Sequence, residues 1–277
     1  MTDPEPPKDL SELERCPACD AERVGDFCHA CGQRYPVGRL TIGGLVRELP
    51  TRLFNFDRGL LHTFLAMVRR PGAVPRDYVN GRRSPYISPL TYFLVAATVQ
   101  LIALTLSQDV LLQHIGQQLA QDPMVGERLT ERLGEDALQT VGKIYLSLLK
   151  QAYTYLFLLC MSLPFALYLR LFTGRLPPRH NLAELLVFSI FTSAHMVLVT
   201  GLILPVTTRI SPLLHVTLSV GLYATIGLFA ARDFFDGGWR RYPLVLISLV
   251  AAMGTFFVSL MILFTAIIVS KGASFSG

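Results

Sequence analysis

The feature that most constrains this chain is a series of apolar stretches long enough to cross a bilayer. They lie at 88–107, 152–172, 182–205, 213–231 and 243–269. A helix needs roughly 20 apolar residues to cross the hydrocarbon core, where its backbone groups must bond within the segment. The sequence therefore predicts an all-α polytopic membrane protein with about five transmembrane helices over 88–271.

Composition and charge support this class. Hydrophobic residues make up 51% of the chain and charged residues 16%, with a mean hydropathy of +0.43, which is unusual for a soluble domain. The net charge is +5, but the arginines concentrate at the ends of apolar segments instead of along one soluble face. We therefore interpret them as topology signals and do not expect nucleic-acid binding.

Four cysteines form a compact C-x2-C-x8-C-x2-C array, Cys16, Cys19, Cys28 and Cys31. The two-residue gaps let both sulfurs of each pair approach one tetrahedral ion at about 2.3 Å. The spacing predicts a zinc ribbon or knuckle over 15–36 with structural Zn²⁺. A redox-active dithiol pair and a disulfide are the alternatives.

The surroundings of the array favour metal. Residues 1–14 are polar, acidic and proline-bearing, so we expect a disordered cytosolic tail, in a compartment whose reducing pool disfavours disulfides. Bulky apolar residues near the cysteines are few, namely Val24, Phe27 and Tyr35. The metal must then supply most of the stability, and a closed four-sulfur site leaves no position for catalysis.

Residues 40–87 combine a helical apolar period with off-stripe charges, which predicts juxtamembrane amphipathic helices. We expect them either to pack on the transmembrane bundle or to lie in the lipid interface. They should end in a membrane-surface elbow whose arginines either bind anionic lipid headgroups or only fix the orientation. Tyr78 is expected to anchor at the membrane interface. The elbow residues are Arg70, Pro71, Gly72, Tyr78, Gly81, Arg82, Arg83 and Tyr86.

This part of the chain carries several ordered landmarks: DRGLLHT at 57–63, RPG at 70–72, RDYVNGRR at 76–83, then Tyr86 and Pro89, and upstream CGQ at 31–33. These runs resemble the bacterial family called domain of unknown function 3667, over about the first third of the chain. The resemblance implies a bacterial membrane protein of uncharacterised role. It supplies no catalytic residues.

Basic residues set the expected orientation. Eleven flank the segment ends that would face the cytosol and six the opposite side, which predicts a bacterial inner-membrane protein with a cytosolic N-terminus and an extracytoplasmic C-terminus. The connection at 108–144 is acidic with near-helical apolar spacing, so we expect an outer lobe of two short helices broken at Pro123. This lobe either docks a partner or caps the bundle.

Gln100, Glu184 and His195 are the candidate intramembrane polar site. Glu184 and His195 are eleven residues apart, about three helical turns, and share a face. Ionisable groups inside a span commonly mark a proton or substrate path. The alternatives are that Glu184 reaches water or Arg179 at the boundary and that His195 only packs. Gln100 is also interpreted as an interhelical contact, and we expect the series Thr217, Gly221 and Thr225 to contact another helix.

Two function hypotheses follow. Neither a phosphate-binding loop, nor paired metal carboxylates within a span, nor a nucleophile elbow is found, so catalysis is not favoured. The first hypothesis is a non-enzymatic scaffold, assembly factor or regulator that binds an unknown protein partner through its zinc knuckle. The alternative is a small-molecule or lipid permease, or a lipid-modifying enzyme, with a polar cavity around His195.

Overall fold

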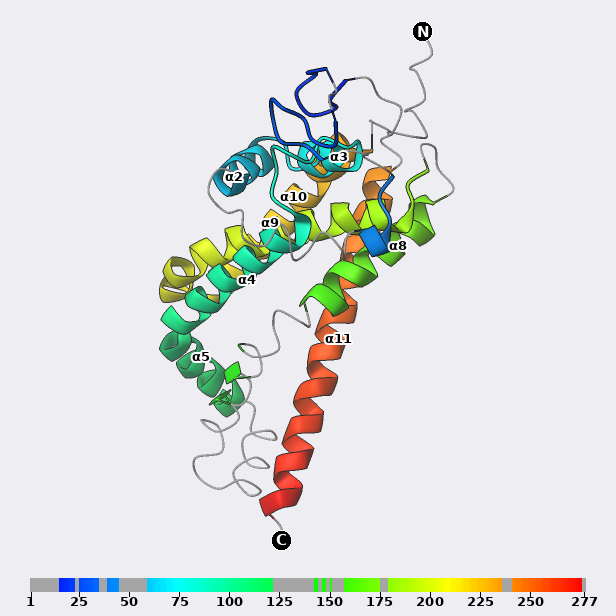
Figure 1. Ribbon diagram of the computed structural model, residues 1–277. Helices are drawn as coiled ribbons and strands as arrows, with labels where there is room; N and C mark the ends of the chain where they lie inside the picture. Colours follow the sequence, from blue (N-terminus) through cyan, green and yellow to red (C-terminus); the bar gives the residue numbers. More distant parts are fainter. Residues whose placement is uncertain are drawn as a thin grey trace.

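The computed structural model describes residues 15–22, 25–34, 39–44, 59–121, 142–143, 146–147, 150, 157–174, 179–235 and 241–275. Apart from the cysteine array, these residues are largely helical (Figure 1). The helices are α2 (Gly59–Arg69), α3 (Ala73–Val79), α4 (Pro89–Leu106), α5 (Gln108–Gln121), η2 (Leu158–Ser162), α8 (Leu163–Thr173), α9 (Leu182–Ile210), α10 (Pro212–Phe234) and α11 (Arg241–Phe275).

Four of these helices, α4, α9, α10 and α11, are long and apolar enough to cross a membrane. The helical membrane-protein class is therefore confirmed, with four candidate spans in the described residues where the sequence suggested about five. The remaining predicted span, 152–172, is described from Phe157 onward and contributes a shorter apolar helix, Leu158–Thr173. Residues 151–156 lie outside the described part of the chain.

Two of the spans begin with the same local signal, a serine followed by proline. The Ser88 hydroxyl accepts the backbone N–H of Thr91 at 3.1 Å, and the Ser211 hydroxyl accepts that of Leu214 at 3.4 Å. Each hydroxyl satisfies a first-turn N–H, and a proline at the first helical position lacks an N–H that would need a partner. These caps fix the starts of α4 and α10.

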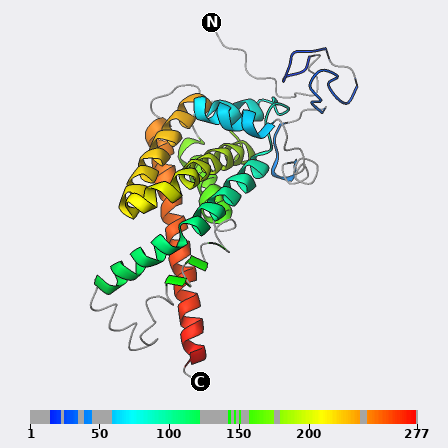
Figure 2. The same cartoon turned by 90° about the vertical axis from the view of Figure 1, so that its left-hand side faces the viewer.

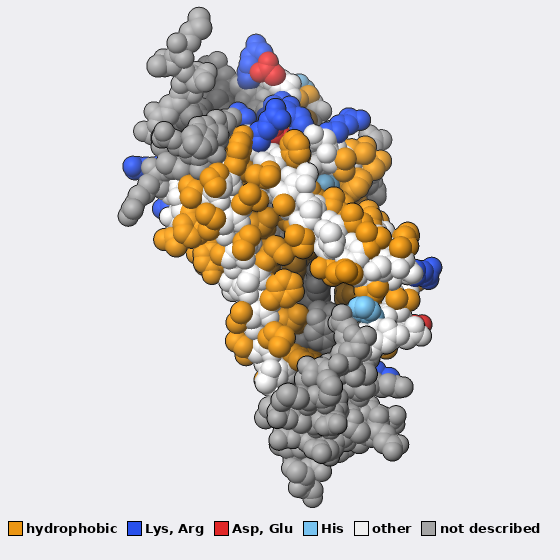
Figure 3. All heavy atoms as spheres, turned by 180° about the vertical axis from the view of Figure 1, so that it is seen from behind, with side chains coloured by type: hydrophobic (Ala, Val, Ile, Leu, Met, Phe, Trp, Pro, Cys, Tyr) orange, Lys and Arg blue, Asp and Glu red, His pale blue; other side chains and the backbone are white. Residues whose placement is uncertain are grey.

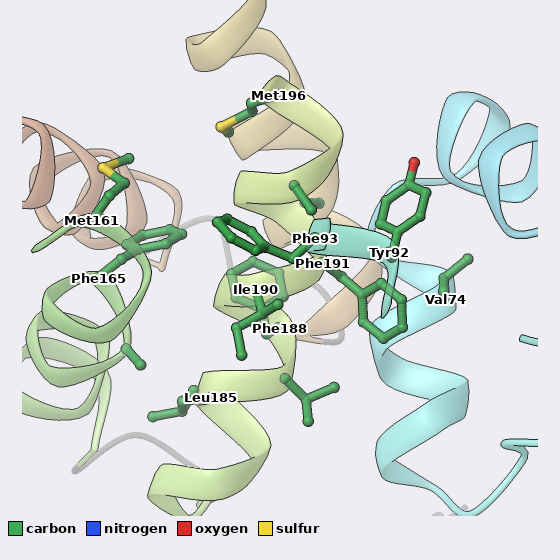
Figure 4. Packing of buried hydrophobic residues seen from close by; sticks show 14 of the residues in the cluster. Val74, Tyr92, Phe93, Met161, Phe165, Leu185, Phe188, Ile190, Phe191 and Met196 are labelled. Carbon is green, nitrogen blue, oxygen red and sulfur yellow. The ribbon is translucent and has the colours of Figure 1, made fainter. Parts of the chain in front are cut away.

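The helix α9 is the centre of the bundle, with α4, α8 and α10 packed around it. In its most apolar window 78% of the residues are buried, against 11% for α10. Phe188 and Phe191 of α9 are fully buried in the core shown in Figure 4. α9 also continues past Pro205 to Ile210, and in its last turns the hydroxyls of Thr207 and Thr208 donate to the carbonyls of Ile203 and Leu204.

The outer face of α10 differs from the expected one. Thr217, Gly221 and Thr225 are exposed, and a methyl group added at Gly221 would meet no atom within 4 Å. The two threonine hydroxyls donate to carbonyls of their own helix. The predicted interhelical contact is therefore wrong within the described residues, because α10 turns its other side to the bundle.

The outer lobe is described only in part. Helix α5 occupies the first half of the predicted lobe, and it breaks from α4 at Ser107. Lys150 donates from Nζ to Oε1 of Gln108 at 2.8 Å, which brings the far end of the connection back to α5. Pro123 and its neighbours, where the second short helix was expected, lie outside the described residues.

Two short helices, α2 and α3, cover the end of the bundle that carries the cysteine array (Figure 2). Helix α3 packs on α9 and α10, and Tyr78 is fully buried with its ring 5.6 Å from Phe191 in an edge contact. The expectation that Tyr78 anchors at the membrane interface is therefore wrong. Its ring fills the gap between α3 and α9, where aromatic edges pack favourably.

Candidate metal centre

The four array cysteines converge on one point. Their sulfur atoms all lie within 4.8 Å of one another, with Cys16 Sγ 3.6 Å from Cys31 Sγ and Cys19 Sγ 3.5 Å from Cys28 Sγ. A tetrahedral ion with metal–sulfur bonds of about 2.3 Å separates its sulfurs by about 3.8 Å. All four are free cysteines. The arrangement fits a single tetrahedral metal ion.

The first half of the centre is a tight turn. The N–H of Cys16 donates to the carbonyl of Ala21, and the N–H of Asp20 donates to the carbonyl of Cys16, both at 2.8 Å. Asp20 has φ +61°, an angle that aspartate tolerates better than most residues. A bridge between Arg15 and Glu22 closes the turn.

The second half of the centre has the same backbone pattern as the first half, shifted by twelve residues. Cys28 donates its N–H to the carbonyl of Gln33, and Gly32 donates to that of Cys28, again at 2.8 Å. Gly32 has φ +71°, and a bridge between Phe27 and Arg34 closes the turn. The two equivalent knuckles each aim two sulfurs at the same point, which explains why the spacing alone predicts the cluster.

The thiol cluster favours a bound cation on electrostatic grounds. Desolvation opposes ionisation of Cys28, but the backbone N–H groups of Cys31 and Ala30, together with the thiols of Cys19 and Cys31, lower the pKa of Cys28 to about 6. Desolvation and the neighbouring thiols raise the pKa of Cys31 to about 12. Without a cation the cluster does not hold four thiolates at neutral pH, whereas a metal ion stabilises all of them.

The array is attached to the elbow by Ser84. Its hydroxyl donates to the carbonyl of Cys31 at 2.6 Å, and its backbone N–H donates to Oε1 of Gln33 at 2.9 Å. Gln33 is buried, so the contact is shielded from water. Sequence reasoning missed this contact, although Gln33 belongs to the CGQ landmark. The cysteine array and the elbow are therefore in direct contact through Ser84.

A second attachment lies at the start of α9. Arg39 Nε donates to Glu184 Oε1 at 2.7 Å, and Asn181 Nδ2 donates to the carbonyl of Leu40 at 3.1 Å. Asn181 and Glu184 form a capping box that begins the helix. Glu184 thus pairs with Arg39 and, through Oε2, with Nδ1 of His180 at 3.4 Å. The sequence suggested Arg179, whose carbonyl instead accepts from Arg39 at 3.5 Å.

His195 sits deep in the bundle. Its Nδ1 shares a 2.7 Å hydrogen bond with the hydroxyl of Tyr92 on α4, and the two rings stack at 6.3 Å. The ring of Phe64 on α2 lies 5.8 Å away. His195 therefore joins α9 to α4 through a buried hydrogen bond and to α2 through a ring contact.

Gln100 makes a different contact. It is buried where α4 meets α9, and a methyl group added at Gly201 would lie 2.7 Å from its Oε1. Glu184 is about 16 Å from His195 along the axis of α9, since each residue adds 1.5 Å. The structure places Gln100, Glu184 and His195 in three separate contacts and does not bring them together.

The elbow is more buried than a surface motif requires. Pro71 and Gly72 are buried, and a methyl group at Gly72 would lie 2.0 Å from the carbonyl oxygen of Ala230 on α10. Gly81 turns the chain with φ +90°. Arg83 is buried, with Nε donating to the carbonyl of Tyr78 at 3.4 Å. These residues hold α3 against the bundle.

Other elbow residues face outward. Arg70 and Arg82 are exposed, and the hydroxyl of Tyr86 donates to Oδ2 of Asp77 at 2.9 Å. Burial is the larger cause and this hydrogen bond the smaller one of a rise in the pKa of Tyr86 to about 12. Tyr86 also stacks on His62 of α2 at 5.5 Å. The elbow thus joins α2 and α3 while leaving two guanidinium groups free to reach outward.

The comparison with known families finds a match over the segment formed by α2, the elbow and most of α4. Residues 57–101 match the family model DUF3667, described as a protein of unknown function. The resemblance seen in the sequence is thereby confirmed over this segment, and the DUF3667 segment carries both Ser84 and Tyr92. Neither a curated protein nor a solved structure matches the chain.

Proposed function

We propose that this chain is a bacterial inner-membrane protein whose knuckle binds structural Zn²⁺ and presents a surface to a cytosolic protein partner. It would act as a non-enzymatic scaffold, assembly factor or regulator. The observation that carries the proposal is a closed four-cysteine site fixed to the membrane bundle at Ser84. A closed site of this kind stabilises a fold and leaves no position for a substrate.

The donor set supports zinc. Four thiolates in a tetrahedral arrangement suit Zn²⁺, whereas hard cations such as Mg²⁺ and Ca²⁺ take oxygen ligands. Here Cys16 and Cys28 are the only buried apolar residues of their own small cluster among the described residues. When bound, the ion supplies the stability that a core of this size lacks.

The exposed face of the knuckle supports a protein partner. Phe27 is 58% exposed, so its ring is available to a partner on the outer face of the knuckle. In the described residues of the knuckle, exposed acids outnumber exposed bases, so there is no basic stripe for nucleic acid. The exposed charges are Arg15, Asp20, Glu22, Asp26 and Arg34.

The charge distribution supports the orientation. Figure 3 shows lysine and arginine atoms gathered at the end that carries the knuckle, above a broad hydrophobic surface. Arginines favour the cytosolic side of membrane proteins, where thiols also remain reduced. Both arguments support a cytosolic knuckle.

Site-specific photo-crosslinking tests the proposal. A photoreactive phenylalanine at Phe27 should form a protein adduct in cells, and the same residue at Phe229, exposed on α10, serves as the control. The adduct at Phe27 should disappear in a Cys28→Ser background and persist in Cys160→Ser. No adduct at Phe27, or an adduct that survives Cys28→Ser, would contradict a metal-dependent partner surface.

A further inference from the structure

The helix α2 exposes an apolar face that no described residue covers. Leu61, Leu65 and Val68 are 66%, 42% and 55% exposed and follow the i, i+4, i+7 spacing of one helix face. The opposite face is anchored, since Met67 and Thr63 are fully buried. The exposed face is therefore a fixed feature of the fold.

The anchoring contacts show why α2 cannot turn this face inward. The Thr63 hydroxyl donates to the carbonyl of Gly59 at 2.6 Å and accepts the N–H of Ile87 at 3.1 Å. Phe64 reaches the ring of His195 inside the bundle. These contacts set the rotation of the helix about its axis.

The placement of α2 relative to the bundle suits a membrane interface. It lies crosswise over the knuckle end of the molecule, across the direction of the long helix α11, in both Figure 1 and Figure 2. A helix that lies in the interface plane buries its apolar face at the acyl boundary and turns basic residues to the headgroups. The candidate spans beside it bring the bilayer within reach.

Charge identifies the lipid class. Arg69 and Arg70 are exposed at the C-terminal end of α2, and Arg82 is exposed on the elbow. Within α2, α3 and the elbow, as described, the one acid is Asp77, which accepts a hydrogen bond from Tyr86. An apolar stripe beside several guanidinium groups matches an anionic phospholipid surface.

We propose that α2 lies in the headgroup region of the leaflet on the knuckle side. Leu61, Leu65 and Val68 contact the acyl boundary, and Arg69 and Arg70 bind the phosphates of anionic phospholipids. This inference does not depend on the partner of the knuckle. The two proposals can fail separately.

Tryptophan quenching by brominated lipids tests the depth of α2. The chain has one tryptophan, Trp239, so Leu65→Trp in a Trp239→Phe background gives a single reporter. In vesicles of phosphatidylcholine brominated near the headgroup end of the acyl chains, this reporter should be quenched. Phe27→Trp in the same background, on the exposed face of the knuckle, should not. Equal quenching of the two reporters would overturn the proposal in favour of water or a protein partner.

A second arm tests the headgroup preference. In mixed vesicles of phosphatidylcholine and phosphatidylglycerol, either lipid carries the bromine in turn. Brominated phosphatidylglycerol should quench Leu65→Trp several-fold more strongly, because each arginine near an anionic surface gives roughly a fivefold preference. Arg69→Gln with Arg70→Gln should remove the difference. Equal quenching by the two lipids in the chain with both arginines would overturn the assignment to anionic headgroups.

Discussion

The knuckle and the bundle bury very different amounts of apolar surface. In the knuckle the described buried apolar cluster consists of Cys16 and Cys28 with three partly buried neighbours. The bundle instead buries a continuous aromatic and aliphatic cluster drawn from nearly every described helix. A residue such as Phe188 has its ring within 4.6 to 6.1 Å of three other phenylalanine rings.

This difference shows two ways of specifying a fold. A metal centre needs ligands at fixed spacings and few other contacts, so short local turns suffice. A packed bundle depends on many weak contacts between distant segments, so replacing any one large buried side chain lowers its stability. The two regions should therefore respond to different perturbations.

The largest expected effect separates the regions by removing one metal ligand. Cys28→Ser should reduce bound zinc from about one ion per chain to nearly none, since such sites supply on the order of 10 kcal/mol. Elemental analysis of the purified protein measures this. Thermal unfolding of the bundle should stay near that of the unaltered chain, and Cys160→Ser should keep its zinc. A zinc content unchanged by Cys28→Ser would disprove the four-cysteine centre.

The second effect reverses the comparison. Phe188→Ala removes a fully buried ring from α9 and should lower the free energy of unfolding by about 3–5 kcal/mol while zinc content stays constant. Denaturation in mild detergent gives the value. Phe229→Ala, on an exposed site of α10, should change it by about 0.5 kcal/mol or less. Similar losses for the two variants would contradict the assignment of α9 to the core.

A third test concerns how tightly the elbow meets the bundle. Gly72→Ala places a methyl group against the carbonyl of Ala230 and should destabilise the chain by about 1–3 kcal/mol. Gly221→Ala enters open space on α10 and should be neutral or stabilising by up to about 1 kcal/mol. Chemical denaturation of both variants measures the two effects. A neutral Gly72→Ala would argue against the close approach of Gly72 to Ala230.

A smaller effect tests the link between the two regions. Ser84→Ala removes the hydrogen bond to the carbonyl of Cys31, worth about 0.5–1.5 kcal/mol, and should speed zinc transfer to a chelator. Ser259→Ala, whose hydroxyl bonds within α11, serves as the control. If both variants released zinc at the rate of the unaltered chain, the knuckle would be energetically independent of the elbow.

The smallest effect is expected at the second attachment. Arg39 is 58% exposed, so solvent screens its pairing with Glu184, although that pairing raises the pKa of Arg39. A double-mutant cycle with Arg39→Gln and Glu184→Gln should give a coupling of about 0.2–1 kcal/mol. A coupling above about 2 kcal/mol would show that the pair of Arg39 and Glu184 is shielded from water.

Sequence patterns predicted the regions unequally. The cysteine spacing identified all four members of the cluster. Apolar length predicted about five spans, and four of them are candidate spans in the described residues. Both signals are local. The burial of Tyr78 and of Gly72 was not predicted. An aromatic residue near basic residues is compatible with an interface anchor or with a core position, and only the approach of α9 makes Tyr78 a core residue.

Sequence patterns also failed to predict contacts between distant segments. Ser84 and Cys31 are 53 residues apart, and Arg39 and Glu184 are 145 residues apart. Neither pair carries a periodic signal. Likewise, the helical period placed Glu184 and His195 on one face but did not reveal that they serve separate contacts.

The sequence by itself determined the four-cysteine cluster and the helical membrane-protein class. Ligand spacing and apolar length act within single segments, so no fold is needed to evaluate them. The tertiary structure decided which polar groups pair, which elbow residues are buried and which face of α2 stays exposed. These outcomes depend on how helices pack side by side, a matter of shape and contact that one-dimensional patterns do not record.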